Sequence, residues 1–171
     1  MHMKQFLVFI VCLFVLGSMT VQAQQSPADI EQTGDEALFE QAAEAVKSGK
    51  FVLKADKLYS KDENQTFTVN NQCNYLIMEN DKAIVQVTNS DHIGFYEEHK
   101  VSDVKIKTDK KGNLLYNALL KDSRKAIRVK IKIRKDTNCG EAIFSSIKKS
   151  GNYILTGSIQ SKDIYNVAKL Y

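Results

Sequence analysis

The sequence predicts a mainly β protein: a single antiparallel β-sandwich or a small, partly closed barrel, preceded by one N-terminal helix. From residue 51 to residue 160, short segments follow one another in which apolar and polar residues alternate. Turn-forming sequences that contain Gly, Asn or Asp separate these segments. Short strands at such regular spacing are typical of sandwiches and small barrels.

Residues 1–23 carry the pattern of a cleavable signal peptide. His2 and Lys4 form a short basic region before an apolar run, and the segment ends at Ala23, a small residue of the kind expected before a cleavage site. The apolar run is shorter than the roughly 20 residues that a membrane-spanning helix needs. We therefore expect cleavage near Ala23 and a periplasmic or secreted mature protein without a transmembrane segment.

The rest of the chain is expected to contain a flexible lead-in, residues 24–34, and one β-rich domain, residues 35–171. This length suits a single domain with a hydrophobic core. Residues 35–48 are predicted to form a helix, because apolar residues recur there at helical spacing and Gly49 follows as a C-terminal stop. The apolar side of this helix is mostly alanine, which predicts close packing on a sheet.

The expected strands are read from the alternation and from the turns between the segments. They lie near residues 51–59, 65–69, 74–78, 82–88, 101–108, 114–120, 125–134, 141–148 and 153–160. The stretch 89–100 has no such alternation and is expected to be the longest loop. The tail 161–171 is predicted to end in a last helical turn.

The clearest alternation is that of residues 125–134, where aliphatic and cationic residues take turns. The aliphatic set is Ile127, Val129, Ile131 and Ile133, and the cationic set is Arg128, Lys130, Lys132 and Arg134. Since a shift by one residue would bury the charges and expose the aliphatic groups, the register is strongly specified. We expect the aliphatic set in the core and the cations in solvent.

Two cysteines, Cys73 and Cys139, remain after removal of the signal peptide. An even pair in an exported chain favours a disulfide between them. The alternative is two free thiols.

Charge is distributed unevenly along the chain. Residues 24–100 hold 7 Lys and Arg against 14 Asp and Glu, whereas residues 101–171 hold 16 against 6. Lys105 and Lys107 form one cationic row, and the four cations of 125–134 form another, because alternate residues of a strand share a face. If the three strands from 101 to 134 form a meander, both rows lie on one outer face, on either side of the middle strand.

This basic face has two interpretations. It is either a solvated surface that prevents aggregation of the sheet, or a binding surface for an anionic amphiphile or polymer, such as the lipid headgroups or acidic glycans of a cell envelope. Nucleic acid is not expected as a partner, because the chain carries an export signal and lacks a recognition motif. We hypothesise a non-catalytic binding or interaction module.

The sequence assigns no catalytic residue and no cofactor. It lacks a nucleophile elbow, a phosphate-binding glycine loop, an H-E-x-x-H helix and a C-x-x-C pair. His92 and His99, with acidic residues beside them, are weak candidates for metal ligands in the expected loop. The alternative function is therefore a small envelope enzyme or metal-binding protein that uses the 91–99 loop.

Four segments, residues 51–56, 83–87, 104–113 and 154–157, resemble a family of exported proteins from Bacteroidetes known as domain of unknown function 4251. The lysine-rich hairpin 104–113 is the most specific of the four. The likeness covers roughly residues 37–160. It implies a signal peptide, a helix and a β domain, and it brings no known activity or catalytic residue.

Overall fold

The computed structural model describes residues 27–61, 63–89, 92–123, 125–135, 139–146 and 152–164. The predicted signal peptide lies outside these ranges. From Glu31 onward the chain forms one compact unit.

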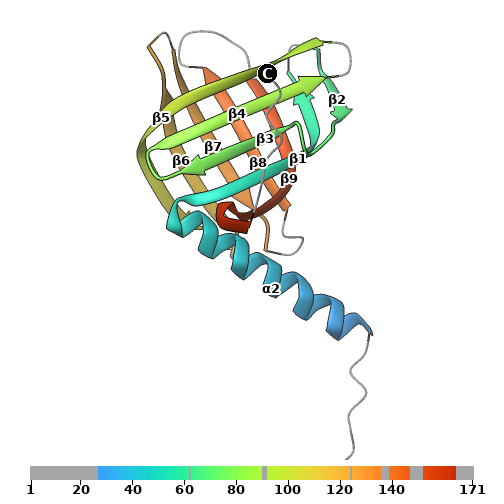
Figure 1. Cartoon of the computed structure of the whole chain (residues 1–171). Coiled ribbons are helices and arrows are strands. Elements are labelled where there is room, and N and C mark those ends of the chain that lie inside the picture. The colour runs from blue at the N-terminus through green and yellow to red at the C-terminus, as the bar shows by residue number, and fades with distance from the viewer. Residues whose placement is uncertain are drawn as a thin grey trace, which may run out of the picture. The chain divides into compact units, whose positions relative to one another are not determined.

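Helix α2 spans Pro27–Ser48 and leads directly into the sheet (Figure 1). It begins at Pro27 rather than at residue 35, so residues 27–34, expected to be a flexible lead-in, are helical; proline suits the first turn of a helix, where no N–H is needed. It ends as predicted: Gly49 has a φ of +74° and donates its N–H to the carbonyl of Val46 at 3.1 Å. No helix of the described ranges combines the length and apolar character needed to cross a bilayer.

In the described part of the chain, nine antiparallel strands follow α2, and their order along the sheet is β2-β1-β3-β4-β5-β6-β7-β8-β9 (Figure 1). Their bounds are β1 Lys50–Ser60, β2 Gln65–Thr68, β3 Tyr75–Glu79, β4 Lys82–Asn89, β5 His92–Thr108, β6 Leu114–Lys121, β7 Ala126–Ile133, β8 Cys139–Ser146 and β9 Asn152–Ser161. A short 3₁₀ helix, η1 (Lys162–Ile164), follows β9.

The sheet closes on itself because β9 also pairs with β1. The result is a closed eight-strand barrel of β1 and β3–β9, with β2 as an extra strand beside β1. The approach of β9 to β1 depends on Gly157: a Cβ there would lie 1.8 Å from the carbonyl oxygen of Lys54. Closure leaves no long unpaired side on β9, and it selects the barrel among the two predicted architectures.

The main difference from the predicted elements concerns residues 89–100. The expected long loop is the first half of β5, which pairs with β4 from His92 to Lys100. The hydrophobic alternation that marks the other strands is missing there because Glu97 and His99 take inward positions in line with Val101. A strand with polar residues on both faces has no period-two hydrophobic signal.

The barrel interior is filled with side chains. In β7 the predicted register is confirmed: Ile127, Val129, Ile131 and Ile133 are between 0 and 7% exposed, and the cations between them are exposed. Phe51 and Tyr116 meet edge to face with ring centroids 5.4 Å apart, and Phe144 stacks on Tyr153 at 4.5 Å. Such packing gives the core its stability through buried apolar area.

The two ends of the barrel differ in what covers them. The helix end is where α2 enters β1, and the helix contributes Ala42, Ala43 and Val46 to the same hydrophobic core as the barrel strands. At the far end, Ser60 of β1 pairs with Tyr153 of β9. The turn between β6 and β7 also lies at the far end, since Lys121 pairs with Ala126 on either side of it.

Cys73 and Cys139 are free thiols in the structure, so the predicted disulfide is not formed. The strand ladder explains why. Cys139 pairs with Ser158, Ser158 with Lys54, and Lys54 with Tyr75, two residues beyond Cys73. Three strand spacings, about 14 Å along the sheet, thus separate the two regions, whereas a disulfide needs Cα atoms roughly 4.4–6.8 Å apart.

Candidate functional site

The cations singled out in the sequence meet on the outer surface of β5, β6 and β7. We call this surface the basic face and define it by Lys105, Lys107, Arg128, Lys130 and Lys132. Lys107 pairs with Leu115, which in turn pairs with Lys132. Lys105 pairs in the same way with Asn117 and then with Lys130. Because directly paired residues share a face, the two rows flank β6 on one side of the sheet, as predicted.

All five cations of the basic face are exposed, whereas the residues of β6 between the rows are half-buried. These are Leu115, Asn117 and Leu119, so β6 turns these three side chains toward the outer face and the alternate ones toward the core. Arg134 is also exposed but lies just beyond β7, where its N–H donates to the carbonyl of Cys139 at 3.0 Å. It continues the row without belonging to the strand.

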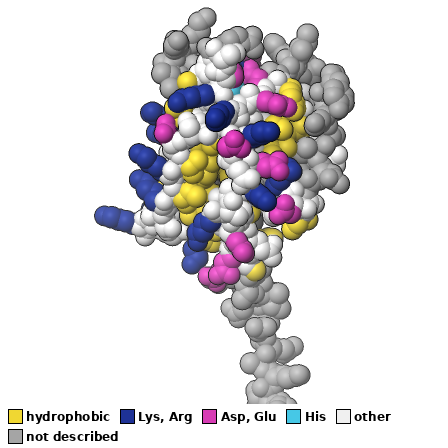
Figure 2. Space-filling model, turned by 60° about the vertical axis from the view of Figure 1, so that its left-hand side comes forward, with side chains coloured by type: hydrophobic (Ala, Val, Ile, Leu, Met, Phe, Trp, Pro, Cys, Tyr) yellow, Lys and Arg dark blue, Asp and Glu magenta, His cyan; other side chains and the backbone are white. Residues whose placement is uncertain are grey.

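The electrostatics of the basic face are dominated by unpaired positive charge. Within the part of the chain that is described, none of its five cations forms an ion pair. The next strand, β8, places one carboxylate, Glu141, opposite Lys132, and uncharged Ile143 and Ser145 opposite the other two cations of β7. In Figure 2, several Lys and Arg side chains lie along the left border of the molecule, and others lie among Asp and Glu side chains nearer the middle of the view.

The spacing of the cations follows from sheet geometry. Neighbours in one row are about 6.8 Å apart along the strand, and the two rows are about 9.6 Å apart, two strand spacings. A set of cations held by a rigid sheet loses little conformational entropy when an anion binds, apart from that of the side chains themselves. The arrangement can therefore hold a ligand that carries several negative charges.

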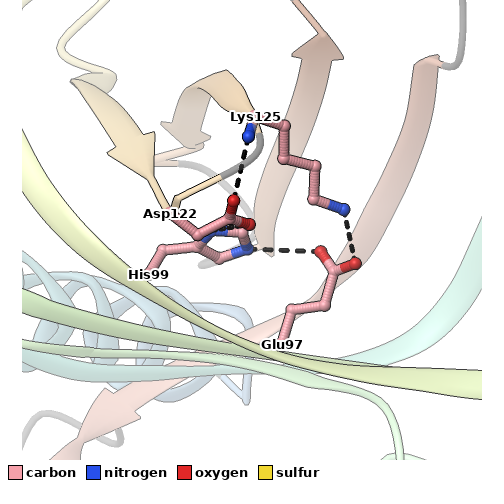
Figure 3. A network of polar contacts seen from close by, with 4 residues as sticks. All are labelled: Glu97, His99, Asp122 and Lys125. Atoms are coloured by element: carbon pink, nitrogen blue, oxygen red, sulfur yellow. Dashed lines mark hydrogen bonds and ion pairs between the residues drawn. The ribbon is translucent and has the colours of Figure 1, made fainter.

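A second polar cluster lies at the far end of the barrel and consists of Glu97, His99, Asp122 and Lys125 (Figure 3). We call it the far-end network. The side chain of His99 is fully buried; its Nε2 lies 3.3 Å from Glu97 Oε2 and its Nδ1 lies 3.5 Å from Asp122 Oδ2. The ammonium of Lys125 pairs with the other oxygen of Glu97, and its backbone N–H donates to Asp122 Oδ1 at 2.9 Å.

The far-end network joins two elements that are distant in sequence. Glu97 and His99 come from β5, and Asp122 and Lys125 from the β6–β7 turn, which is closed by the hydrogen bond from the N–H of Asp122 to the carbonyl of Lys125 at 3.1 Å. Neither ring nitrogen of His99 has the geometry of a hydrogen bond, although each lies within 3.5 Å of a carboxylate oxygen. Burial, with a smaller contribution from the Glu97 carboxylate, raises the pKa of nearby Tyr153 far above its ordinary value.

The structure changes the interpretation of the two histidines. His99 does not lie in a solvated loop but inside the barrel, between two carboxylates; the side chain of His92 lies outside what is described. The described ranges contain no group of three or more His, Cys, Asp or Glu residues arranged to hold a metal ion. No local pattern points to Asp122 and Lys125 as members of this cluster, because only the fold brings the β6–β7 turn to β5.

Comparison with known proteins finds a similar solved structure and a matching family. The structure matches the crystal structure, at 1.95 Å resolution, of a DUF4251 family protein from Bacteroides eggerthii DSM 20697, with a TM-score of 0.68 and 22% sequence identity. The match covers 79% of this chain and 95% of that chain. None of the curated proteins matches this chain. The family model described as "Domain of unknown function (DUF4251)" matches residues 33–159, which confirms the resemblance, and the chain therefore belongs to the DUF4251 family.

Proposed function

We propose that this protein is an exported, non-catalytic binding module that holds an acidic glycan of the cell envelope on its basic face. One observation carries the proposal: the strand register sets two rows of cations, none of them in an ion pair among the described residues, on either side of β6. Export rests on the signal-peptide pattern of residues 1–23. After export, such a face meets the anionic polymers and headgroups of the envelope.

The burial of β6 favours a charged polymer over an amphiphile. Leu115 and Leu119 are half-buried between the cationic rows, so little apolar surface is left for an acyl chain to cover. A glycan with repeated carboxylates can contact cations of both rows at once. Each further contact adds to the free energy of binding without a new loss of the glycan's translational freedom. Single ion pairs at an exposed face contribute little by themselves, which is why several are needed.

The test uses polygalacturonate as the acidic glycan and dextran as the neutral one. We expect the protein to bind polygalacturonate and not dextran. Raising the ionic strength from about 0.01 to 1 M shortens the screening length from about 30 to 3 Å and should abolish this binding. Vesicles of anionic or neutral lipid form a second arm: preference for anionic vesicles over polygalacturonate would assign the face to lipid headgroups instead.

A charge-reversal variant ties binding to the basic face. Lys130→Glu with Lys132→Glu should weaken polygalacturonate binding at least about tenfold, since two attractive contacts become repulsive. The matched control is Lys57→Glu with Lys61→Glu, which changes the net charge equally at two exposed lysines of β1 and the turn after it. Equal weakening by both variants would show that only net charge matters, and would leave the solvated, anti-aggregation surface as the interpretation.

A further inference from the structure

Strand β5 extends beyond its neighbour β4 and leaves one side without a strand. Residues 92–100 pair with β4, while residues 100–108 pair with β6. Past Lys100, the last backbone bond toward β4 is donated by the N–H of Val101 to the carbonyl of Asp81 at 2.7 Å. Within the described ranges no strand pairs with this side of residues 102–108, which we call the free edge.

The backbone groups of the free edge can be assigned from the turn that follows it. The N–H of Asp109 donates to the carbonyl of Asn113 at 2.9 Å, so Asp109 directs its backbone groups toward β6. In an antiparallel ladder this direction alternates from one residue to the next. Lys105 and Lys107 therefore direct theirs toward β6, and Ile106 and Thr108 direct theirs toward the free edge, where another strand can bind them.

The side chains of the free edge are sorted by face. Val104 and Ile106 are 47% and 38% exposed, which places two large aliphatic groups in solvent on one face. Lys105 and Lys107 are exposed on the other face. A bulge at residues 102–105, where Asp103 has a φ of +54°, separates this segment from the part of β5 that pairs with β4.

The charges decide which strand fits. A second copy paired antiparallel through Ile106 would set Lys105 against Lys107 of the other copy, and like charges directly opposite each other are destabilising. A strand that alternates acidic and aliphatic residues would instead set carboxylates opposite the lysines and aliphatic groups opposite Val104 and Ile106. We propose that the free edge binds an extended segment of a partner protein with this alternating pattern, as an added strand of the sheet.

The proposal is tested with a synthetic peptide of about seven residues in which glutamate and valine alternate. A control peptide has the same composition with the glutamates and valines in two blocks. Amide hydrogen exchange, followed by NMR, measures the free edge directly. The amides of Ile106 and Thr108 should exchange fast in the free protein, and the alternating peptide should lower their exchange rates at least about tenfold. The amides of Lys105 and Lys107 bond to β6, so the peptide should leave them unchanged.

Two variants of Thr108 isolate the backbone donor. Thr108→Pro removes the N–H that faces the free edge and no bond to β6, and should weaken peptide binding at least about tenfold, while Thr108→Val keeps the N–H and should change it less than about twofold. If Thr108→Pro does not fold, Val104→Glu, which adds repulsion at an exposed position, should weaken binding by at least the same factor.

Two exchange results would overturn the proposal: equal protection of the amides by the two peptides, or no protection of the amides of Ile106 and Thr108. A folded Thr108→Pro protein that binds the alternating peptide as well as Thr108→Val does would also overturn it. The variant Lys130→Glu with Lys132→Glu separates this inference from the proposed glycan binding. It lies outside the free edge and should keep peptide binding within about twofold, because charges on β7 are two strands away. A joint loss of both activities would contradict an independent edge site.

Discussion

The two ends of the barrel are closed by different forces. At the helix end, Val46 of α2 and Phe51 of β1 belong to one fully buried apolar core, and Phe51 contacts the ring of Tyr116. At the far end, the equally buried imidazole of His99 lies between the carboxylates of Glu97 and Asp122, and the ammonium of Lys125 pairs with Glu97. Screening by a simple salt such as NaCl weakens ion pairs and leaves apolar burial nearly unchanged, so the two ends should respond differently to added salt when each is perturbed.

The largest effect is expected at the helix end. Phe51→Ala removes a fully buried ring and leaves a cavity, and should lower the free energy of unfolding by about 3–5 kcal/mol. Urea unfolding at low and high salt measures this loss, which should be the same in both. A loss that shrinks with added salt would mean that the helix end, too, is held by charge.

Alkaline pH should act on the same end through Tyr116. Burial raises the pKa of Tyr116 to about 12, above its ordinary value of 10.0. The unfolded chain then loses the Tyr116 proton at a lower pH than the folded protein. The contribution of Tyr116 to the free energy of unfolding is therefore complete below pH 10 and declines as the pH rises toward 12, by at most about 3 kcal/mol. Unfolding of the wild type and of Tyr116→Phe between pH 8 and 12 measures it; parallel curves would disprove the contribution of Tyr116.

A smaller loss with the opposite salt behaviour is expected at the far end. Glu97→Gln removes the charge that faces both His99 and Lys125, and should lower the free energy of unfolding by about 1–3 kcal/mol. The difference from the wild type should shrink at high salt. Glu98→Gln is the control, because Glu98 is the exposed neighbour on the other face of β5, and it should change stability by less than about 0.5 kcal/mol. Equal effects of the two changes would contradict a specific role of the far-end network.

The smallest effect on stability is expected on the basic face. Lys132→Ala should change the free energy of unfolding by less than about 0.5 kcal/mol, because this side chain is exposed and forms no ion pair among the described residues. Thermal or urea unfolding provides the check. A loss above about 1 kcal/mol would indicate that the cations of this face serve the fold rather than a ligand.

The same contrast between apolar and polar packing limits what the sequence predicts. The alternation of β7 predicts the register of this strand correctly because its inward positions are all aliphatic. The same register predicts that the cationic rows face outward. The pattern does not predict the first half of β5, because Glu97 and His99 occupy inward positions. A hydrophobic pattern reports burial of apolar groups only, so a strand whose core positions are charged resembles a loop.

Long-range contacts explain the other differences. The β6–β7 turn meets β5 only through barrel geometry, so Asp122 and Lys125 carry no local signal of their place in the far-end network. Likewise, an even number of cysteines does not show how far apart Cys73 and Cys139 lie, because the strands between them are arranged only by the fold. The free edge of β5 follows from the unequal lengths of β4 and β5, which depend on the tilt of strands in a closed barrel.

The most direct test of the proposed function maps the ligand onto the surface. NMR chemical-shift changes on titration with short oligomers of polygalacturonate should concentrate at Lys105, Lys107, Lys130, Lys132 and the β6 residues between them. The far-end network and the lysines of the β5–β6 turn, Lys110 and Lys111, should change little, and the shifts should disappear at about 1 M salt. Shifts centred on that turn or at the far end, or none at low salt, would contradict the assignment of the basic face as the binding surface.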